Sequence, residues 1–166
     1  MGKVLADITP ELQQWIEKQH IFCEASALLS ANGHINCPHK MRQFFSHFRP
    51  LEVFYLDYTG SGAKNVAHVH ENQRLVVMFC AFDGSPKIVR LHGNASVITP
   101  EHVRYSEMTQ VFPPHIGTRA FIHLAVNRAS DSCGYSVPFY NFQEHRDILD
   151  KWCENKGAEK VAEYRI

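Results

Sequence analysis

Tyr55-Leu56-Asp57-Tyr58-Thr59-Gly60-Ser61-Gly62-Ala63-Lys64-Asn65 is the stretch from which the fold is most directly inferred. Residues 51–58 are rich in aromatic and aliphatic side chains and predict a buried strand, whereas residues 64–73 predict a helix. The Gly-Ser-Gly turn therefore joins the end of a strand to the start of a helix. Backbone N–H groups are free at such a junction, and the helix dipole adds about half a positive charge.

This turn supports two interpretations. Hydroxyl groups from Thr59 and Ser61, with the ammonium group of Lys64, complete a cradle for a phosphate group, and the glycines let the phosphate approach the backbone. A plain connection between strand and helix is the alternative, because the turn matches neither the P-loop nor the dinucleotide fingerprint. Asp57 either orients this loop or only stabilises the turn.

Strand patterns dominate the chain on both sides of the turn. The further strands are expected at residues 21–29, 34–38, 75–82, 88–98 and 120–126. Asn32-Gly33 predicts a type I′ hairpin turn between the first two, and Asp83-Gly84 predicts a turn between the next two. Gly93 lies in the middle of a strand, which indicates a bulge or a close approach of two backbones.

Helices are expected mainly at the two ends of the chain. Thr9-Pro10-Glu11 is typical of a helix start, and an apolar stripe follows it to about His20. Pro100-Glu101 predicts a short helix, and residues 147–155 predict a helix that Gly157 ends. These patterns predict a mainly β protein, an antiparallel barrel with flanking helices.

Composition limits the classes of partner. The 166 residues include 17 Lys and Arg against 17 Asp and Glu, so no net charge attracts nucleic acid or an anionic membrane. We expect neither as a partner, and the cation–aromatic mixture at residues 42–50 is better explained by a loop that packs on the barrel or on a second subunit. No run of about 18 apolar residues predicts a membrane span. Five scattered Cys residues favour reduced thiols and a cytoplasmic location.

No metal site is expected. His68 and His70 invite that interpretation, but on a helix of ~3.6 residues per turn the two side chains diverge. Solvent-exposed or capping histidines are the better interpretation.

Five segments in consistent order carry a resemblance to a known family. They are residues 33–40, residues 55–62, the run His68-Val69-His70-Glu71-Asn72-Gln73-Arg74-Leu75-Val76-Val77-Met78-Phe79-Cys80-Ala81-Phe82-Asp83-Gly84, the strand Lys87-Ile88-Val89-Arg90-Leu91-His92-Gly93, and residues 132–138. The chain resembles the pyridoxamine 5′-phosphate oxidase-like, FMN-binding split-barrel family, in one of its poorly characterised branches. The resemblance implies one domain over residues 1–166, with an N-terminal helix at about 9–20. It also implies a six-stranded antiparallel split barrel at about 21–140 and a C-terminal helix at about 141–157.

The resemblance further implies a homodimer that holds FMN in the groove between its subunits. The residues that it assigns to the cofactor, together with the cradle above, are Lys40, Asp57, Thr59, Gly60, Ser61, Gly62, Lys64, Asn65, Arg90 and Tyr135. Lys40 stands for the basic residue of the second strand, and Arg90 is either an anion ligand or a member of a buried pair. Tyr135 and Pro138 flank the flavin ring. No catalytic residue is assigned.

Departures from the family pattern keep a second hypothesis open. Residues 37–41 replace a stretch that usually contains a Ser and a Gly, and residues 63–65 lack a phosphate-binding Thr. Ile88 stands where the oxidase has a flavin-contacting Gln, so the chain is not expected to be the oxidase itself. The first hypothesis is an FMN-dependent oxidoreductase of unknown substrate. The alternative is a non-catalytic or haem-binding split-barrel dimer with a degenerate flavin site.

Overall fold

The computed structural model of the chain describes residues 2–41, 45–112 and 115–165. Its strands are β1 (Lys3–Leu5), β2 (Ile21–Ala25), β3 (His39–Met41), β4 (Phe45–Arg49), β5 (Glu52–Tyr58), β6 (Arg74–Cys80), β7 (Ile88–Ile98) and β8 (Thr118–Ser132). Its helices are α1 (Pro10–Glu17), α2 (Ala63–Asn72), α3 (Tyr105–Val111) and α4 (Ile148–Glu163). The protein is mainly β with flanking helices, as its sequence predicts.

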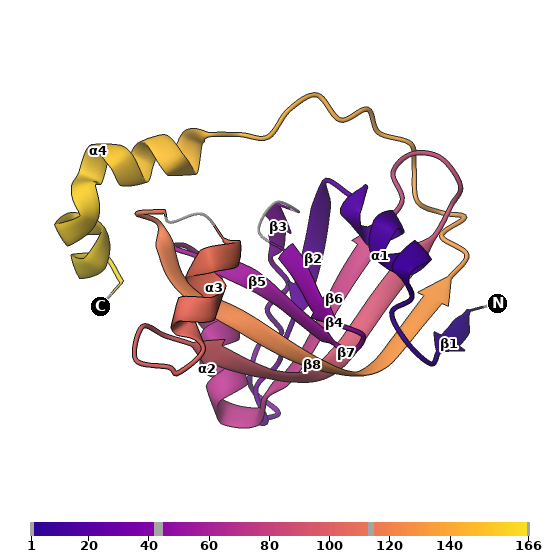
Figure 1. The fold of residues 1–166 in the computed structure, drawn as a ribbon, viewed down its shortest axis with the longest axis horizontal. Helices are drawn as coiled ribbons and strands as arrows, with labels where there is room; N and C mark the ends of the chain where they lie inside the picture. Colours follow the sequence, from indigo (N-terminus) through magenta and orange to yellow (C-terminus); the bar gives the residue numbers. More distant parts are fainter. Residues whose placement is uncertain (1, 42–44, 113–114, 166) are drawn as a thin grey trace.

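The strands form one antiparallel sheet that curves into a nearly closed barrel (Figure 1). Their order is β3-β2-β6-β7-β8-β5-β4, and β1 pairs with the far end of β8. Within the described residues this is an 8-stranded sheet, against the six strands expected. One additional strand is β4, which lies in the stretch 42–50 where a loop was expected. Residues 42–44 of that stretch lie outside the described residues, and β4 forms because it pairs with β5 across a tight turn.

Strand β5 contributes to two apolar cores because both of its faces are buried. Val53 and Tyr55 face the interior of the barrel, where they join the main core. Phe54, Leu56 and Tyr58 belong to a second core, which four buried side chains from α3, from the residue that follows α3, and from α4 cover. Those four are Met108, Phe112, Cys153 and Val161. Burial on both faces fixes the register of β5, and it therefore fixes the position of the turn that follows.

Several local predictions are confirmed. Thr9 caps α1 by accepting a hydrogen bond from the Leu12 amide at 3.3 Å, although α1 ends at Glu17 rather than near His20. Strand β7 spans residues 88–98, and the ladder between β7 and β8 is irregular at Gly93, where a Cβ atom would collide with the Ala125 carbonyl group. Helix α2 ends at Asn72, and Gln73, which caps it, has a φ of 62°.

The predicted type I′ turn at Asn32-Gly33 is wrong. That turn needs positive φ at both residues, and neither has it. The returning strand β3 begins only at His39, and before it a single bridge joins Ser26 to Asn36. A Cβ atom on Gly33 would lie 2.7 Å from the Leu28 Cβ atom, so glycine is required there by space rather than by φ.

One further helix prediction is corrected, and another is confirmed. Residues 100–104 form turns, and the short helix expected at Pro100 begins instead at Tyr105. Gly157 ends a helix as predicted: its non-helical angles, φ 76° and ψ 161°, divide α4 into two helical segments that meet at a kink, and the second segment runs to Glu163. The two segments pack on the same core, because Cys153 and Val161, on either side of Gly157, are both buried in the second core.

Helix α4 reaches its place through a long arm without helix or strand, residues 133–147. The arm leaves the end of β8, crosses above α1 and β2, and leads to α4 beyond the opposite end of the sheet (Figure 1). His20 holds the arm by stacking on Phe142, with ring centroids 3.8 Å apart, and the Tyr140 amide donates to the Phe82 carbonyl group at 2.9 Å. Among the described helices, none is long and apolar enough to cross a membrane.

Candidate cofactor-binding site

A groove of about 1540 Å³ lies between the arm, α4 and the adjacent mouth of the barrel. Lining residues on the barrel side include Lys40 of β3, Tyr58 and the turn Thr59–Gly62. Tyr140 and Phe142 of the arm and Trp152 of α4 line the other sides. The groove is therefore built from segments that lie far apart in the sequence, and it is large enough for a nucleotide-sized ligand.

The turn between β5 and α2 brings the start of a helix to this groove. Gly62 occupies the N-cap position and supplies no side-chain hydrogen bond, and the first turn of α2 carries no acidic residue. The first amides of the helix are therefore not capped by a side chain. Gly60 has a φ of 140°, and a Cβ atom there would meet nothing within 4 Å, so open space lies beside the turn. An anion is the ligand that such a helix start favours.

A chain of buried charges lies directly under the turn. The Lys40 ammonium group is 2.9 Å from Asp57 Oδ1 and 3.2 Å from Glu24 Oε1. Asp57 Oδ2 accepts a hydrogen bond from Arg119 Nε at 2.7 Å. A Cβ atom on Gly62 would lie 2.6 Å from Asp57 Oδ1 and 2.7 Å from Lys40 Nζ. Glycine at position 62 therefore lets the turn lie against these charges.

Burial and charge pairing act in opposite directions on this network. Burial alone would lower the pKa of Lys40, but the carboxylates of Asp57 and Glu24 outweigh it, and the pKa is raised. For Glu24, burial raises the pKa more than Lys40 lowers it. Tyr55 donates a hydrogen bond to Glu24, and burial raises the pKa of this tyrosine well above its usual value. Lys40 therefore stays charged, and its charge is already balanced by its neighbours.

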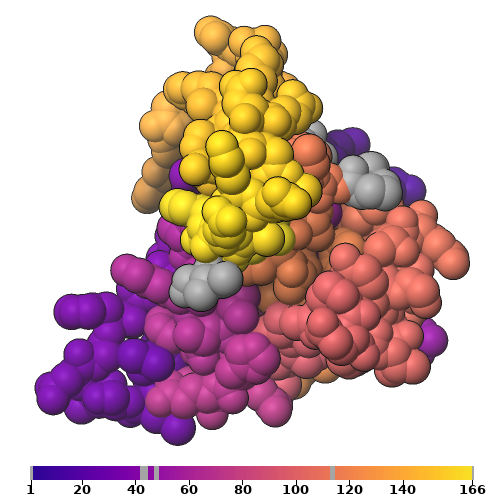
Figure 2. Space-filling view, turned by 90° about the vertical axis from the view of Figure 1, so that its left-hand side faces the viewer, coloured from indigo at the N-terminus to yellow at the C-terminus, as the bar shows by residue number. Residues whose placement is uncertain are grey.

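Arg165, which follows α4, brings a further cation to the turn. Its Nε donates to Thr59 Oγ1 at 2.8 Å, and its Nη2 donates to the Ile116 carbonyl oxygen at 2.8 Å. Residue Thr59 is only 2% exposed, and its hydroxyl also donates a hydrogen bond to the Gly117 carbonyl group at 2.9 Å. Figure 2 shows the C-terminal segment in yellow beside the magenta segment of α2. The Thr59 hydroxyl thus orients Arg165 and is not free for a ligand.

Helix α4 gives the groove an apolar wall. Ile148, Leu149, Trp152 and Tyr164 line it, and Ile148 and Tyr164 are 65% and 60% exposed. The rings of Trp152 and Tyr164 lie edge to face with centroids 5.1 Å apart, and Lys156 Nζ lies 5.2 Å from the Trp152 centroid. A flat aromatic ligand is suited to such a wall. The arrangement can therefore hold a molecule that is anionic at one end and aromatic at the other.

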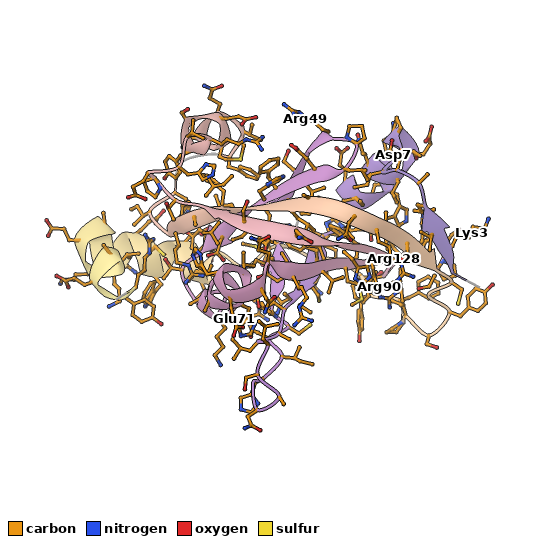
Figure 3. All side chains as sticks on the ribbon, turned by 90° about the horizontal axis from the view of Figure 1, so that it is seen from below. Lys3, Asp7, Arg49, Glu71, Arg90 and Arg128 are labelled. Atoms are coloured by element: carbon orange, nitrogen blue, oxygen red, sulfur yellow. The ribbon has the colours of Figure 1, made fainter. Side chains whose placement is uncertain are left out.

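The structure brings some predicted site residues together and leaves others elsewhere. Lys40, Thr59, Gly60, Ser61 and Gly62 line the groove, with Asp57 under them. Arg90 does not line it: Arg90 donates to Ser132 Oγ at 3.1 Å on the outer face of the sheet, on the side away from α4 (Figure 3). Tyr135 is 82% exposed and also lies outside the groove, whereas Tyr140 and Phe142 of the same arm line it.

Two residues at the start of α2 also lie outside the groove lining. Lys64 is exposed. Asn65 is 3% exposed, and its Oδ1 accepts hydrogen bonds from Ser26 Oγ at 2.5 Å and Asn36 Nδ2 at 2.8 Å. His68 is buried as well and bonds Ser26 Oγ at 2.8 Å, so the expectation of an exposed or capping histidine is wrong there. His70 is exposed.

Sequence reasoning missed Glu24, Arg119, Arg165 and the α4 wall. Arg119 is 62 residues from Asp57, and Arg165 is 106 residues from Thr59. No pattern of neighbouring residues predicts a contact between side chains that lie so far apart in the sequence. An isolated acid in an apolar strand was the available signal for Glu24, since a buried carboxylate needs a partner.

Comparisons with known proteins agree with this architecture. A family model described as pyridoxamine 5′-phosphate oxidase matches residues 8–133. The pyridoxamine 5′-phosphate oxidase family protein ustO from Aspergillus flavus is 36% identical over 166 residues. That similarity covers 96% of this chain and 66% of the relative, so the chain spans just under two thirds of the relative's length.

Solved structures share the fold at low sequence identity. HupZ from Group A Streptococcus has a TM-score of 0.60 and 17% identity, over 81% of this chain and 99% of that one. An FAD-binding protein from Mycobacterium smegmatis has a TM-score of 0.54 and 10% identity, over 78% and 96%. The haem storage protein HutZ from Vibrio cholerae has a TM-score of 0.52 and 13% identity, over 74% and 92%.

Proposed function

The chain belongs to the pyridoxamine 5′-phosphate oxidase family, and from this premise we propose that it is a flavoprotein that binds FMN in the groove and serves as an oxidoreductase. One observation carries the proposal: the turn Thr59–Gly62, which leads into α2 and supplies no side-chain cap to it, lines a groove whose other wall is aromatic. The two ends of FMN, a phosphate and a flat ring system, have the chemistry of these two sides.

The residues present fit this cofactor. The phosphate would lie at Ser61 and Gly62, where the helix amides and the dipole favour a doubly charged anion. The flavin ring would lie along Trp152 and the apolar residues of α4. The cations lining the groove, apart from the neutralised Lys40, are Lys18, Arg146 and Lys156, against Asp83 and Glu144. Bound FMN would supply hydride or electron transfer, while the chain supplies position and electrostatics.

The proposal includes a homodimer. Val76, Met78 and Cys80 on the outer face of β6 are only partly buried, and this face needs a cover. Tyr135 and Phe139 on the arm are 82% and 80% exposed, which suits an arm that contacts a second subunit. Arg90, on the same outer face, would then approach the partner's groove. The free thiols of the five cysteines suit a reducing, cytoplasmic environment.

A charge introduced at the turn tests the phosphate site. Ser61 is exposed in the turn before α2, and Ser106 is exposed in the first turn of α3, so Ser61→Glu and Ser106→Glu form a matched pair. We expect Ser61→Glu to weaken FMN binding about tenfold to hundredfold through like-charge repulsion, and to change riboflavin binding little. Ser106→Glu should leave both dissociation constants unchanged. Titration followed by flavin fluorescence measures all of them.

Haem is the second candidate, because the fold is shared with a haem storage protein and His20, His39 and His145 line the groove. The absorption spectrum of the purified protein separates the two candidates. A flavin band near ~450 nm supports the first and a Soret band supports the second. A colourless protein that takes up neither FMN nor haemin would indicate a non-catalytic module and would overturn the proposal.

A further inference from the structure

We propose that residues 141–156 form a lid over the groove, that the lid pivots at Gly157, and that a clasp at Asp150 holds it closed. The lid consists of the end of the arm and the first segment of α4. The proposal concerns access to the groove, so it does not depend on which ligand the groove holds. Tyr135 and Phe139, through which the arm would contact a second subunit, lie outside the lid.

The lid supplies one side of the groove. Residues 141–146 of the arm, with Leu149 and Trp152 of α4, line the groove together with Lys40 and the turn Thr59–Gly62 on the barrel side. A ligand that fills this groove of about 1540 Å³ therefore contacts both the barrel and the lid. Movement of the lid away from the barrel would uncover that ligand.

The lid is attached to the rest of the molecule over a small buried surface. All of its residues are described, and from residue 141 to 149 every side chain is exposed except that of His145, which is partly buried. The arm part is held by the Phe142 ring, which stacks on His20 with centroids 3.8 Å apart. Cys153 is the one fully buried residue of the lid. Segments with so little buried surface open at a lower free-energy cost than the whole domain.

One carboxylate fastens the lid to the barrel. Asp150 Oδ1 accepts a hydrogen bond from the Tyr58 hydroxyl at 2.8 Å, and His115 Nε2 lies 3.1 Å from the same oxygen. Tyr58 ends β5 and His115 precedes β8, so both partners belong to the barrel. The side chains of Asp150 and His115 are partly exposed, so water can replace each partner when the lid leaves. The clasp is therefore a reversible contact.

Gly157 separates the lid from a second segment that stays in place. Its φ of 76° and ψ of 161° are not helical, and a Cβ atom there would meet nothing within 4 Å. Figure 1 shows the change of direction within α4. Beyond the kink, Val161 is fully buried in the second core, and Arg165 donates to Thr59 Oγ1 at 2.8 Å. Because glycine has a freer backbone than other residues, rotation at Gly157 can move the lid while the second segment keeps its contacts.

Thiol labelling measures the opening directly, because Cys153 is fully buried while the lid is closed. Val161→Cys adds a second buried thiol on the fixed side of the kink. N-ethylmaleimide labels both thiols, and mass spectrometry of the peptides follows each one separately. We expect Cys153 to react at least about tenfold faster than the introduced thiol, since local opening costs less than global unfolding. Equal rates would mean that only global unfolding exposes Cys153, and they would overturn the lid.

A matched pair of variants in the Val161→Cys background tests the clasp. Asp150→Ala removes the clasp, whereas Asp147→Ala removes a carboxylate that pairs with Lys151 inside the lid. We expect Asp150→Ala to raise the labelling rate of Cys153 about tenfold, the usual effect of a lost charged hydrogen bond, and Asp147→Ala to change it less than about twofold. An unchanged rate in Asp150→Ala, or an equal rise at both buried thiols, would overturn the clasp.

FMN tests whether the lid controls the groove. A ligand that binds only under the closed lid slows its opening by mass action, so FMN at about ten times its dissociation constant should slow Cys153 labelling about tenfold. Cys133, which is exposed and outside the lid, should react at the same rate throughout. FMN that binds without slowing Cys153 would overturn this control. A protein that binds no FMN would reject the proposed flavoprotein, while the labelling rates without ligand still decide the lid.

Discussion

Two buried polar clusters meet the first turns of α2, and they differ in charge. The first cluster contains no Asp, Glu, Lys or Arg and is called the uncharged cluster for that reason. It ties α2 to the hairpin of β2 and β3 and consists of Ser26, Asn36, Asn65 and His68. The charged cluster lies under the turn that precedes α2 and consists of Glu24, Lys40, Asp57 and Arg119. Both lie between the barrel and its helices, so hydrogen bonds or ion pairs within each cluster must offset the free energy of removing its polar groups from water.

The two clusters differ in role: the uncharged cluster attaches the β2–β3 hairpin to α2, and the charged cluster lies beside the candidate ligand site. Short hydrogen bonds without an ion pair are sufficient to hold a hairpin against a helix, and none of the four side chains of the uncharged cluster lines the groove. Buried ion pairs stabilise a fold less reliably, because desolvation offsets much of their attraction. The charged cluster lies where the groove opens, and Lys40 forms part of the groove wall. Charge is thus retained next to the candidate ligand and absent where only attachment is needed.

The largest expected effect is on the charged cluster. Asp57→Ala leaves Lys40 and Arg119 without their shared carboxylate, and we expect a loss of about 3–5 kcal/mol in the free energy of unfolding. Urea denaturation measures it. Adding Arg119→Met to Asp57→Ala should recover part of the loss, because the guanidinium group that has lost its carboxylate partner is then removed, whereas Lys40 keeps Glu24 at 3.2 Å. A loss below about 1 kcal/mol for Asp57→Ala would mean that water already reaches this cluster.

A smaller effect is expected in the uncharged cluster. Asn65→Ala removes the acceptor of Ser26 and Asn36, which should cost about 1–3 kcal/mol in the free energy of unfolding. We expect no change in the FMN dissociation constant, because the Asn65 side chain is engaged by the hairpin. A variant with normal stability and weakened FMN binding would restore Asn65 to the cofactor site, where the sequence had placed it.

The smallest effect is a pH dependence confined to the charged cluster. Burial raises the pKa of Glu24 above its ordinary value of 4.5. The folded protein therefore binds this proton more tightly than the unfolded chain. Its contribution to stability is complete below pH 4.5 and is lost as the pH rises through the raised pKa. We expect the stability of wild type minus that of Glu24→Gln to fall over that window, by at most about 1.4 kcal/mol per pH unit. A difference that does not vary with pH would show that Glu24 titrates normally.

Local sequence patterns determined the elements and the turn. The apolar runs at β5, β6 and β7 specify strands because such side chains need burial, and Asp83-Gly84 specifies a turn, in which Gly84 has a φ of 61°. The same reasoning failed at Asn32-Gly33, where packing against Leu28 overrode the turn preference. It succeeded at Gly157, which ends the first segment of α4 with a φ of 76°, although the sequence did not predict the second helical segment that follows.

For the site, the sequence by itself determined that a small, hydroxyl-bearing turn starts a helix after a buried strand, because that depends on neighbours along the chain. Only the tertiary structure decided which charges surround the turn. It placed Glu24 and Asp57 against Lys40, and it brought Arg165 across 106 residues to Thr59. The physical reason is that charge pairing acts over a few ångströms in space, and the barrel and its bent C-terminal helix set those distances.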